Sequence, residues 1–228
     1  MPRTSYDIAV VSLPAGRAGG TAARVAAVLR RLLLPSVLGL LAACGNSVPP
    51  LPALAPGDVI VAFGDSLTYG TGASGEQSYP AVLSQLIGRE VIGQGVPGER
   101  TDGGLQRLPE VLDEYRPRLL LLCLGGNDML RKVGASVTEA NLRRMVELAR
   151  SRGTEVVLIA VPAPSLFGGS ADFYSRIAED FSLPIENDII NAVLRDNALK
   201  SDPIHPNAEG YRRIAEAIAE LLRNAGAV

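Results

Sequence analysis

Short apolar runs alternate with helix-like segments from position 59 to the end of the chain. Runs with the length and composition of buried strands occupy residues 59–63, 90–92, 118–124 and 155–161, and a weaker run covers 185–190. Apolar residues recur at helical spacing over residues 80–88, 102–115, 136–152, 173–181 and 208–224. This alternation predicts an α/β domain over residues 58–228, with a mostly parallel sheet covered by helices on both faces.

Two local signals refine the predicted helices. Pro109 lies inside the segment 102–115, where a proline is expected to break the helix. Ser136 and Glu139 have the spacing of a capping box, so the next helix is expected to begin at Ser136.

The first strand ends abruptly in a polar turn. The stretch VIVAFGDSLTYG, Val59 to Gly70, passes from five apolar residues into Gly64, Asp65 and Ser66. Open parallel sheets keep their sites at the carboxyl ends of the strands, so a serine hydroxyl is expected at that edge. Taken alone, the triplet also has a simple structural explanation, because Gly, Asp and Ser are common turn residues.

Two further strands end in polar turns that contain glycine. The second strand runs into GQGVPGERT, residues 93–101, and the third into GGND, residues 125–128. Because parallel strands share their carboxyl edge, Ser66, the turn at 95–98 and Asn127 are predicted to meet there. One such turn merely stops a strand, whereas three that each offer a nucleophile or a hydrogen-bond donor favour a catalytic site.

The only histidine of the chain lies in DPIHPN, residues 202–207. A serine nucleophile needs a base, and imidazole is the usual one near neutral pH. Pro203 and Pro206 bias Asp202 and His205 toward extended conformations, which stiffens the loop at both residues. Asp202 can fold back onto the imidazole and fix its tautomer, as in a Ser-His-Asp arrangement. Without Ser66, a helix-start histidine and a turn-forming aspartate would explain this loop as well.

Composition narrows the possible functions of these 228 residues. The chain has no Trp and a formal net charge of −2, which argues against a nucleic-acid-binding surface. One histidine and two cysteines, Cys44 and Cys123, offer no metal ligand set, and no cofactor is expected. Cys123 lies in LLLLCLGG, where it is expected to be a small buried hydrophobe.

The N-terminal segment has the order of a secretory signal. Residues 1–31 carry five arginines and one acid, and the apolar stretch 32–43 precedes Cys44. LAAC, residues 41–44, resembles the lipobox of bacterial lipoproteins, whose cysteine is lipidated and becomes the new N-terminus. The basic region is unusually long, which fits either an extended leader or a later translation start. We therefore expect a signal peptide over 1–43, a lipid on Cys44 and an exported, membrane-anchored protein of net charge −6.

Residues 44–57, CGNSVPPLPALAPG, are rich in proline. This composition predicts a semi-rigid spacer between Cys44 and the domain rather than a folded element.

The motifs together resemble the GDSL-type esterases of the SGNH hydrolase superfamily over about residues 59–224. FGDSLTYG matches the first block of that family, GVPGERT the second, GGND the third and DPIHPN the last. The spacing is similar to that of the periplasmic acyl-CoA thioesterase/lysophospholipases and the arylesterases. Two positions depart from the family pattern: Gly93-Gln94-Gly95 replaces a segment that usually begins Asn-Ala-Gly, and Pro203 replaces a more usual glycine.

The resemblance implies a flavodoxin-like three-layer α/β/α fold and a role for each motif. Ser66 would be the nucleophile, His205 its base and Asp202 the carboxylate that orients the histidine. The backbone N–H groups of Ser66 and Gly98 and the side chain of Asn127 would form the oxyanion hole. The implied substrates are small esters, thioesters or lysophospholipids.

One loop is a candidate for substrate choice. Residues 162–170 follow the fourth strand, and Leu166 and Phe167 form an apolar tip beside two glycines. This tip is expected to cover an acyl chain, although a solvated loop with incidental apolar residues explains it equally well.

Two alternatives to an acyl hydrolase remain at this point. One is a deacetylase of cell-surface carbohydrate, and the other is a surface binding protein whose hydrolase site is vestigial.

Overall fold

The computed structural model of this protein describes residues 48–163 and 169–228, together with the single residue Ser12. Residues 48–228 form one compact unit that contains the whole described core. A parallel five-stranded sheet lies at its centre, in the order β2-β1-β3-β4-β5. The strands are β1 (Ile60–Gly64), β2 (Val91–Gly95), β3 (Leu119–Cys123), β4 (Glu155–Ile159) and β5 (Ile185–Glu186). This is the flavodoxin-like order, and it confirms the predicted fold class.

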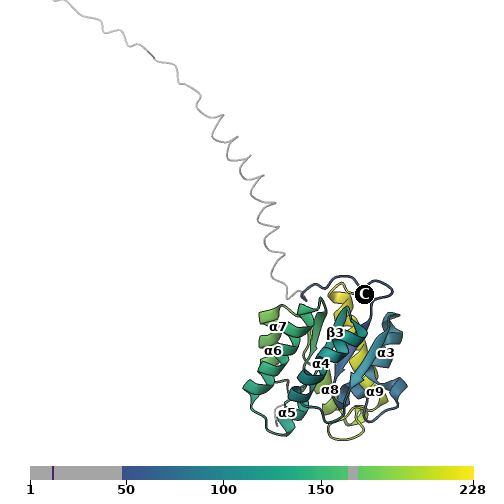
Figure 1. The fold of residues 1–228 in the computed structure, drawn as a ribbon. Helices are drawn as coiled ribbons and strands as arrows, with labels where there is room; N and C mark the ends of the chain where they lie inside the picture. Colours follow the sequence, from purple (N-terminus) through teal and green to yellow (C-terminus); the bar gives the residue numbers. More distant parts are fainter. Residues whose placement is uncertain (1–11, 13–47, 164–168) are drawn as a thin grey trace, which may run out of the picture. The chain divides into compact units, whose positions relative to one another are not determined.

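Helices cover both faces of the sheet. Their bounds are α2 (Ser66–Tyr69), α3 (Tyr79–Ile87), α4 (Thr101–Tyr115), α5 (Gly126–Leu130), α6 (Ala135–Ser151), α7 (Asp172–Phe181), α8 (Ile189–Arg195) and α9 (Ala208–Asn224). The strand order reverses direction after β2, and right-handed crossovers then place the helices before and after β2 on opposite faces. Helix α3 packs with α9, and α9 with α8, while α4, α6 and α7 pack together on the other face (Figure 1).

Three fully buried tyrosines tie helices to the segments that follow the strands. Tyr79 of α3 forms a 3.0 Å hydrogen bond with the Thr68 hydroxyl in α2. Tyr174 of α7 donates to the carbonyl of Leu124 at 2.7 Å, and Tyr211 of α9 donates to the carbonyl of Thr71 at 2.8 Å. Each ring fills the core while its hydroxyl satisfies a polar group at the carboxyl edge of the sheet. These contacts hold that edge in place.

Some helices differ from the sequence-based expectation. Helix α4 continues through Pro109, because burial of Leu108, Val111 and Leu112 against the sheet outweighs the lost hydrogen bond. Helix α6 begins at Ala135 with Gly134 as N-cap, so the predicted capping box at Ser136 is wrong. The weak strand predicted over 185–190 has only two strand residues, and the chain then turns into α8.

The segment 48–57 packs against the domain, whereas the sequence predicted a semi-rigid spacer over 44–57 rather than a folded element. The N–H groups of Leu51 and Leu54 donate to the carbonyls of Ala225 and Ala227 at 2.8 and 2.9 Å. The Leu54 side chain is buried in the core. Prolines stiffen this stretch, but its leucines attach it to the end of α9. Cys44 and the predicted signal peptide 1–43 lie outside the described residues, Ser12 excepted.

In the described part of the chain, none of the helices is long and apolar enough to span a membrane.

Candidate active site

Ser66 is the first residue of the short helix α2, directly after the buried strand β1. Asp65 caps this helix, since its Oδ1 accepts the Leu67 N–H at 3.0 Å. A Cβ at Gly64 would overlap the Thr68 hydroxyl and the carbonyl of Cys123, so only glycine allows this tight exit from the sheet. The serine hydroxyl therefore stands at the carboxyl edge on a rigid turn.

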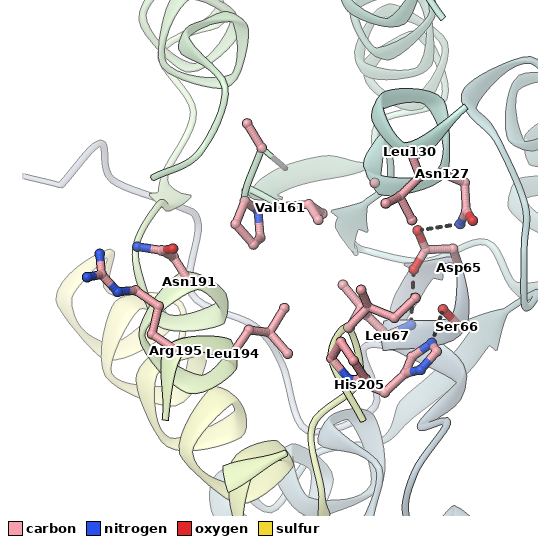
Figure 2. A pocket seen from close by; sticks show the side chains of 15 residues that line it. Asp65, Ser66, Leu67, Asn127, Leu130, Val161, Asn191, Leu194, Arg195 and His205 are labelled. Atoms are coloured by element: carbon pink, nitrogen blue, oxygen red, sulfur yellow. Dashed lines mark hydrogen bonds between the residues drawn. The ribbon is translucent and has the colours of Figure 1, made fainter. Parts of the chain in front are cut away.

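His205, which comes from the C-terminal part of the sequence, contacts Ser66. His205 Nε2 lies 3.0 Å from Ser66 Oγ, and His205 Nδ1 lies 2.7 Å from Asp202 Oδ2 (Figure 2 shows the Ser66–His205 bond). Since the carboxylate can only accept, Nδ1 carries the proton and Nε2 is free to accept from the serine. The three side chains thus have the connectivity of a Ser-His-Asp triad.

The loop that carries His205 is closed on itself. Asp202 Oδ1 accepts the N–H groups of both Ile204 and His205 at 2.9 Å, which leaves Oδ2 for the imidazole. An isolated bridge pairs Lys200 with Pro206 at the base of the loop. The hydrogen bond with His205 is the main cause that lowers the pKa of the half-exposed Asp202. Asp202 consequently stays ionised, as its orienting role requires.

Asn127 follows β3 in α5, and its side-chain amide points at Asp65. Asn127 Nδ2 donates to Asp65 Oδ2 at 3.1 Å (Figure 2). Asp65 is 2% exposed, and this burial raises the pKa of its carboxyl to about 6. At neutral pH the carboxylate only accepts, so it fixes the amide with Nδ2 toward itself. The second Nδ2 hydrogen remains available to another acceptor. The contact between Asp65 and Asn127 was not predicted from the sequence.

Gly98 occupies a tight turn after β2. The Glu99 N–H donates to the Val96 carbonyl at 3.1 Å, and Pro97 followed by Gly98 with φ +77° fits a type II turn. Arg107 of α4 supports this turn through Glu99 at 2.7 Å and the Gln94 carbonyl at 3.2 Å. Gln94 lies in the Gly93-Gln94-Gly95 segment that differs from the usual family pattern. Its carbonyl nevertheless accepts a hydrogen bond from Arg107, so this segment remains attached to α4.

A buried carboxylate links the two segments that carry Gly98 and Asn127. Asp128, next to Asn127, accepts from the Thr101 N–H at 2.9 Å and from the Thr101 hydroxyl at 2.6 Å. Thr101 is the first residue of α4, three positions after Gly98. Helices α4 and α5 are therefore joined at their starts.

A pocket of about 330 Å³ opens beside Ser66 and His205 (Figure 2). Its walls are largely apolar and come from separate parts of the fold: Leu67, Leu130, Val161, Leu194 and Ile204. Leu194 belongs to α8, a helix that the sequence analysis did not predict. Its seven residues are too few to show a clear helical periodicity of apolar positions. Pro162 and Ala163 line the pocket, whereas Leu166 and Phe167 lie outside the described residues.

The structure brings Ser66, His205, Asp202 and Asn127 to one edge of the sheet. Gly98 stands on the neighbouring turn but is not among the residues that line the pocket. Within the described residues, no three His, Cys, Asp or Glu side chains are grouped as metal ligands would be. Such an arrangement can activate a serine hydroxyl for attack on a carbonyl carbon.

The chain is similar to known proteins over most of the domain. The family model described as "GDSL-like Lipase/Acylhydrolase family" matches residues 62–213. A thioesterase 1/protease 1/lysophospholipase L1 of Escherichia coli (strain K12) is 29% identical over 177 residues, 74% of this chain and 85% of that protein. An arylesterase of Vibrio mimicus is 31% identical over 174 residues, 72% of this chain and 87% of its own length.

Among solved structures, the SGNH-hydrolase family esterase AlinE4 is similar to this chain. It has a TM-score of 0.59 and 30% sequence identity, and the match covers 76% of this chain and 98% of that one.

The Asp65–Asn127 contact generates a prediction that separates activity from stability. In Asp65→Asn, one carboxylate oxygen becomes an NH2 group, so the side chain can no longer accept from both Leu67 and Asn127. The Asn127 amide then loses its fixed orientation, and kcat for p-nitrophenyl acetate should fall about 10²-fold at pH 8. Because burial raises the Asp65 pKa to about 6, the ionised carboxylate destabilises the folded wild type above that pH. As pH falls through 6, protonation removes this penalty in the wild type only. The stability of the variant relative to wild type should therefore decline by on the order of 1 kcal/mol between pH 8 and pH 5.

Denaturant unfolding at the two pH values measures this difference. Asp113→Asn, which removes an exposed carboxylate, is the matched control and should leave both kcat and the pH dependence unchanged. Wild-type kcat in Asp65→Asn would contradict the positioning of Asn127 by Asp65.

Proposed function

The chain belongs to the GDSL-like lipase/acylhydrolase family of ester hydrolases, and we propose that it cleaves carboxylic esters or thioesters through an acyl-enzyme on Ser66. The observation that carries this proposal is the continuous contact from Ser66 Oγ to His205 Nε2 at 3.0 Å and from His205 Nδ1 to Asp202 at 2.7 Å. This contact supplies a nucleophile, a base and a group that fixes the tautomer of the base.

The proposed reaction uses each of these groups in turn. Ser66 Oγ attacks the carbonyl carbon while its proton passes to His205 Nε2. The protonated imidazole then gives this proton to the leaving alcohol or thiol as the ester bond breaks. A water molecule, deprotonated by the same Nε2, then attacks the carbonyl carbon of the acyl-serine. The bond from this carbon to Oγ breaks, the carboxylic acid leaves, and Nε2 returns the proton to Ser66 Oγ. Asp202 holds the imidazole in position and stabilises its charged form.

The negative charge on the carbonyl oxygen needs donors at the same edge. The proposal assigns this role to the N–H groups of Ser66 and Gly98 and to the side chain of Asn127. Ser66 stands at the first position of a helix, where its N–H has no intrahelical partner. Asn127 keeps one Nδ2 hydrogen free once Asp65 has taken the other. Removal of one such donor commonly lowers kcat by about 10²–10³.

The pocket supports an acyl chain as the part of the substrate that is bound. Its walls are largely apolar, and α8 closes the side opposite Ser66 (Figure 2). The proposal places the chain along Leu194 and under the loop tip at Leu166 and Phe167. The names of the relatives support small esters, thioesters or lysophospholipids as substrates. The proposed reaction needs no cofactor.

The proposal extends to cellular location. Residues 1–43 act as a lipoprotein signal peptide, and Cys44 carries the lipid that attaches the enzyme to a membrane of the cell envelope or periplasm. A single acyl chain binds membranes only weakly, so stable attachment requires the several chains of a bacterial lipoprotein.

The first prediction from this proposal concerns the nucleophile. Ser66→Ala should abolish hydrolysis of p-nitrophenyl acetate and labelling by a serine-reactive fluorophosphonate, because the attacking oxygen is gone. The fold should persist, since a hydroxyl at the protein edge is not part of the core. Ser151→Ala, at the exposed end of α6, is the control and should react like wild type. Labelling of the folded Ser66→Ala protein would remove Ser66 from the mechanism.

The second prediction concerns chain length. Leu194→Phe enlarges the wall opposite the nucleophile, so long acyl chains should lose space while acetate does not. The kcat/KM for p-nitrophenyl octanoate relative to p-nitrophenyl acetate should fall about tenfold. Leu86→Phe enlarges an exposed leucine of α3 that does not line the pocket, and it should keep the wild-type ratio. An unchanged ratio in Leu194→Phe would place the acyl chain elsewhere.

The third prediction concerns the anchor. In the native host, the wild type should fractionate with membranes and incorporate labelled palmitate, because Cys44 is the lipid acceptor. Cys44→Ser should do neither, and Cys123→Ser, which alters a cysteine buried in β3, should still be labelled. A soluble, unlabelled wild type would refute lipidation and leave the hydrolase proposal unaffected.

A further inference from the structure

Exposed hydrophobic side chains gather at the carboxyl edge of the sheet. Six large hydrophobic residues are exposed in the described part of the chain, and five of them follow the ends of β1, β2 and β3 or lie in the His205 loop. These five are Tyr69, Val96, Leu130, Val137 and Ile204, which we call the rim. The sixth, Leu86, lies near the end of α3. Exposed apolar residues are normally scattered, so their collection at one edge points to a contact surface.

Close approaches connect most of the rim into one surface around the pocket. A Cβ at Gly95, the neighbour of Val96, would overlap the backbone nitrogen of Tyr69. A Cβ at Gly98 would lie 3.7 Å from Nη2 of Arg131, beside Leu130. Leu130 and Ile204 line the same pocket. Figure 2 shows Leu130 and the His205 loop on two sides of this opening.

The segment 130–137 adds charge to the rim. Its sequence, LRKVGASV, contains two basic residues, Arg131 and Lys132, and no acid. Both basic side chains are exposed, and neither forms a salt bridge with a described residue. Leu130 and Val137 flank them with exposed fractions of 49% and 52%. Apolar side chains beside unpaired basic ones are the composition of surfaces that lie in an anionic lipid interface.

We infer that the rim docks the protein on an anionic lipid bilayer, with Leu130 and Val137 inserted among the acyl chains. Arg131 and Lys132 then lie at the level of the lipid headgroups and neutralise them. Docking in this way puts the mouth of the pocket at the surface where amphiphilic esters collect. The inference concerns binding only, and it does not depend on whether Ser66 is the nucleophile.

Vesicle co-sedimentation tests the inference with residues 48–228, which contain the whole described core, so that the N-terminal segment adds nothing to binding. The Ser66→Ala background prevents lipid cleavage during the assay. Vesicles of phosphatidylcholine with one third phosphatidylglycerol should bind the protein, and vesicles of phosphatidylcholine alone should bind it far less. Added salt should weaken binding to the anionic vesicles.

Two pairs of variants separate charge from insertion. Arg131→Gln/Lys132→Gln should weaken binding to the anionic vesicles roughly 30-fold, since each charge near such a surface contributes about one factor of five. Arg116→Gln/Arg144→Gln removes two charges elsewhere and should bind like the parent. Leu130→Ser/Val137→Ser should lose about tenfold, whereas Leu86→Ser should lose nothing.

The outcomes are distinct from those for catalysis. Equal binding to neutral and anionic vesicles, no binding to either, or equal losses in the rim variants and their controls would each overturn the inference. Circular dichroism confirms that each variant is folded. Hydrolysis of a soluble ester by the wild-type protein is measured separately, so failure of vesicle binding and failure of the proposed reaction are told apart.

Discussion

A hydrogen bond of 3.0 Å between His205 and Ser66 joins residues that are 139 positions apart in the chain. Its geometry survives only if both ends are held independently. Ser66 is held by β1, whose five residues are all buried between two neighbouring strands. His205 is held by a loop that closes on Asp202 and leads into α9. Helix α9 in turn packs against α3, and Tyr211 fixes it to the segment just after Ser66. The packing of β1, α3 and α9 thus holds both partners of the Ser66–His205 hydrogen bond in place.

The same edge contains two buried carboxylates that have different surroundings. Asp128 accepts two hydrogen bonds from Thr101, one from its N–H and one from its hydroxyl, and these bonds join two helices. Asp65 accepts from Leu67 and Asn127 but remains desolvated, which raises its pKa. The charge on Asp65 lowers the stability of the fold, but the carboxylate holds the Asn127 amide in one defined orientation. This agrees with the general observation that strained or costly features collect at functional sites.

The sequence was most informative where chemistry requires particular residues at strand ends. The runs before Ser66 and Asn127 predicted β1 and β3 to within one residue, because buried parallel strands are continuously apolar. The Asp202–His205 contact was predictable because the two residues are neighbours in one short loop. The pocket wall at Leu194 was not, since its helix is short and its partners are distant in sequence. The packing of 48–57 was missed because prolines suggested a spacer, while the contacts of Leu51 and Leu54 depend on where α9 ends.

The attachment of Leu51 and Leu54 to Ala225 and Ala227 has a topological consequence. It places the entry to the domain beside its last residues, so the two ends of residues 48–228 are neighbours in space. A short peptide could join them, and new ends could be opened in an exposed loop, without moving any strand in the sheet. The order in which serine, asparagine and histidine follow one another along the chain is therefore not required by the geometry of the site. The chemistry would accept a circularly permuted chain in which the histidine loop is made first.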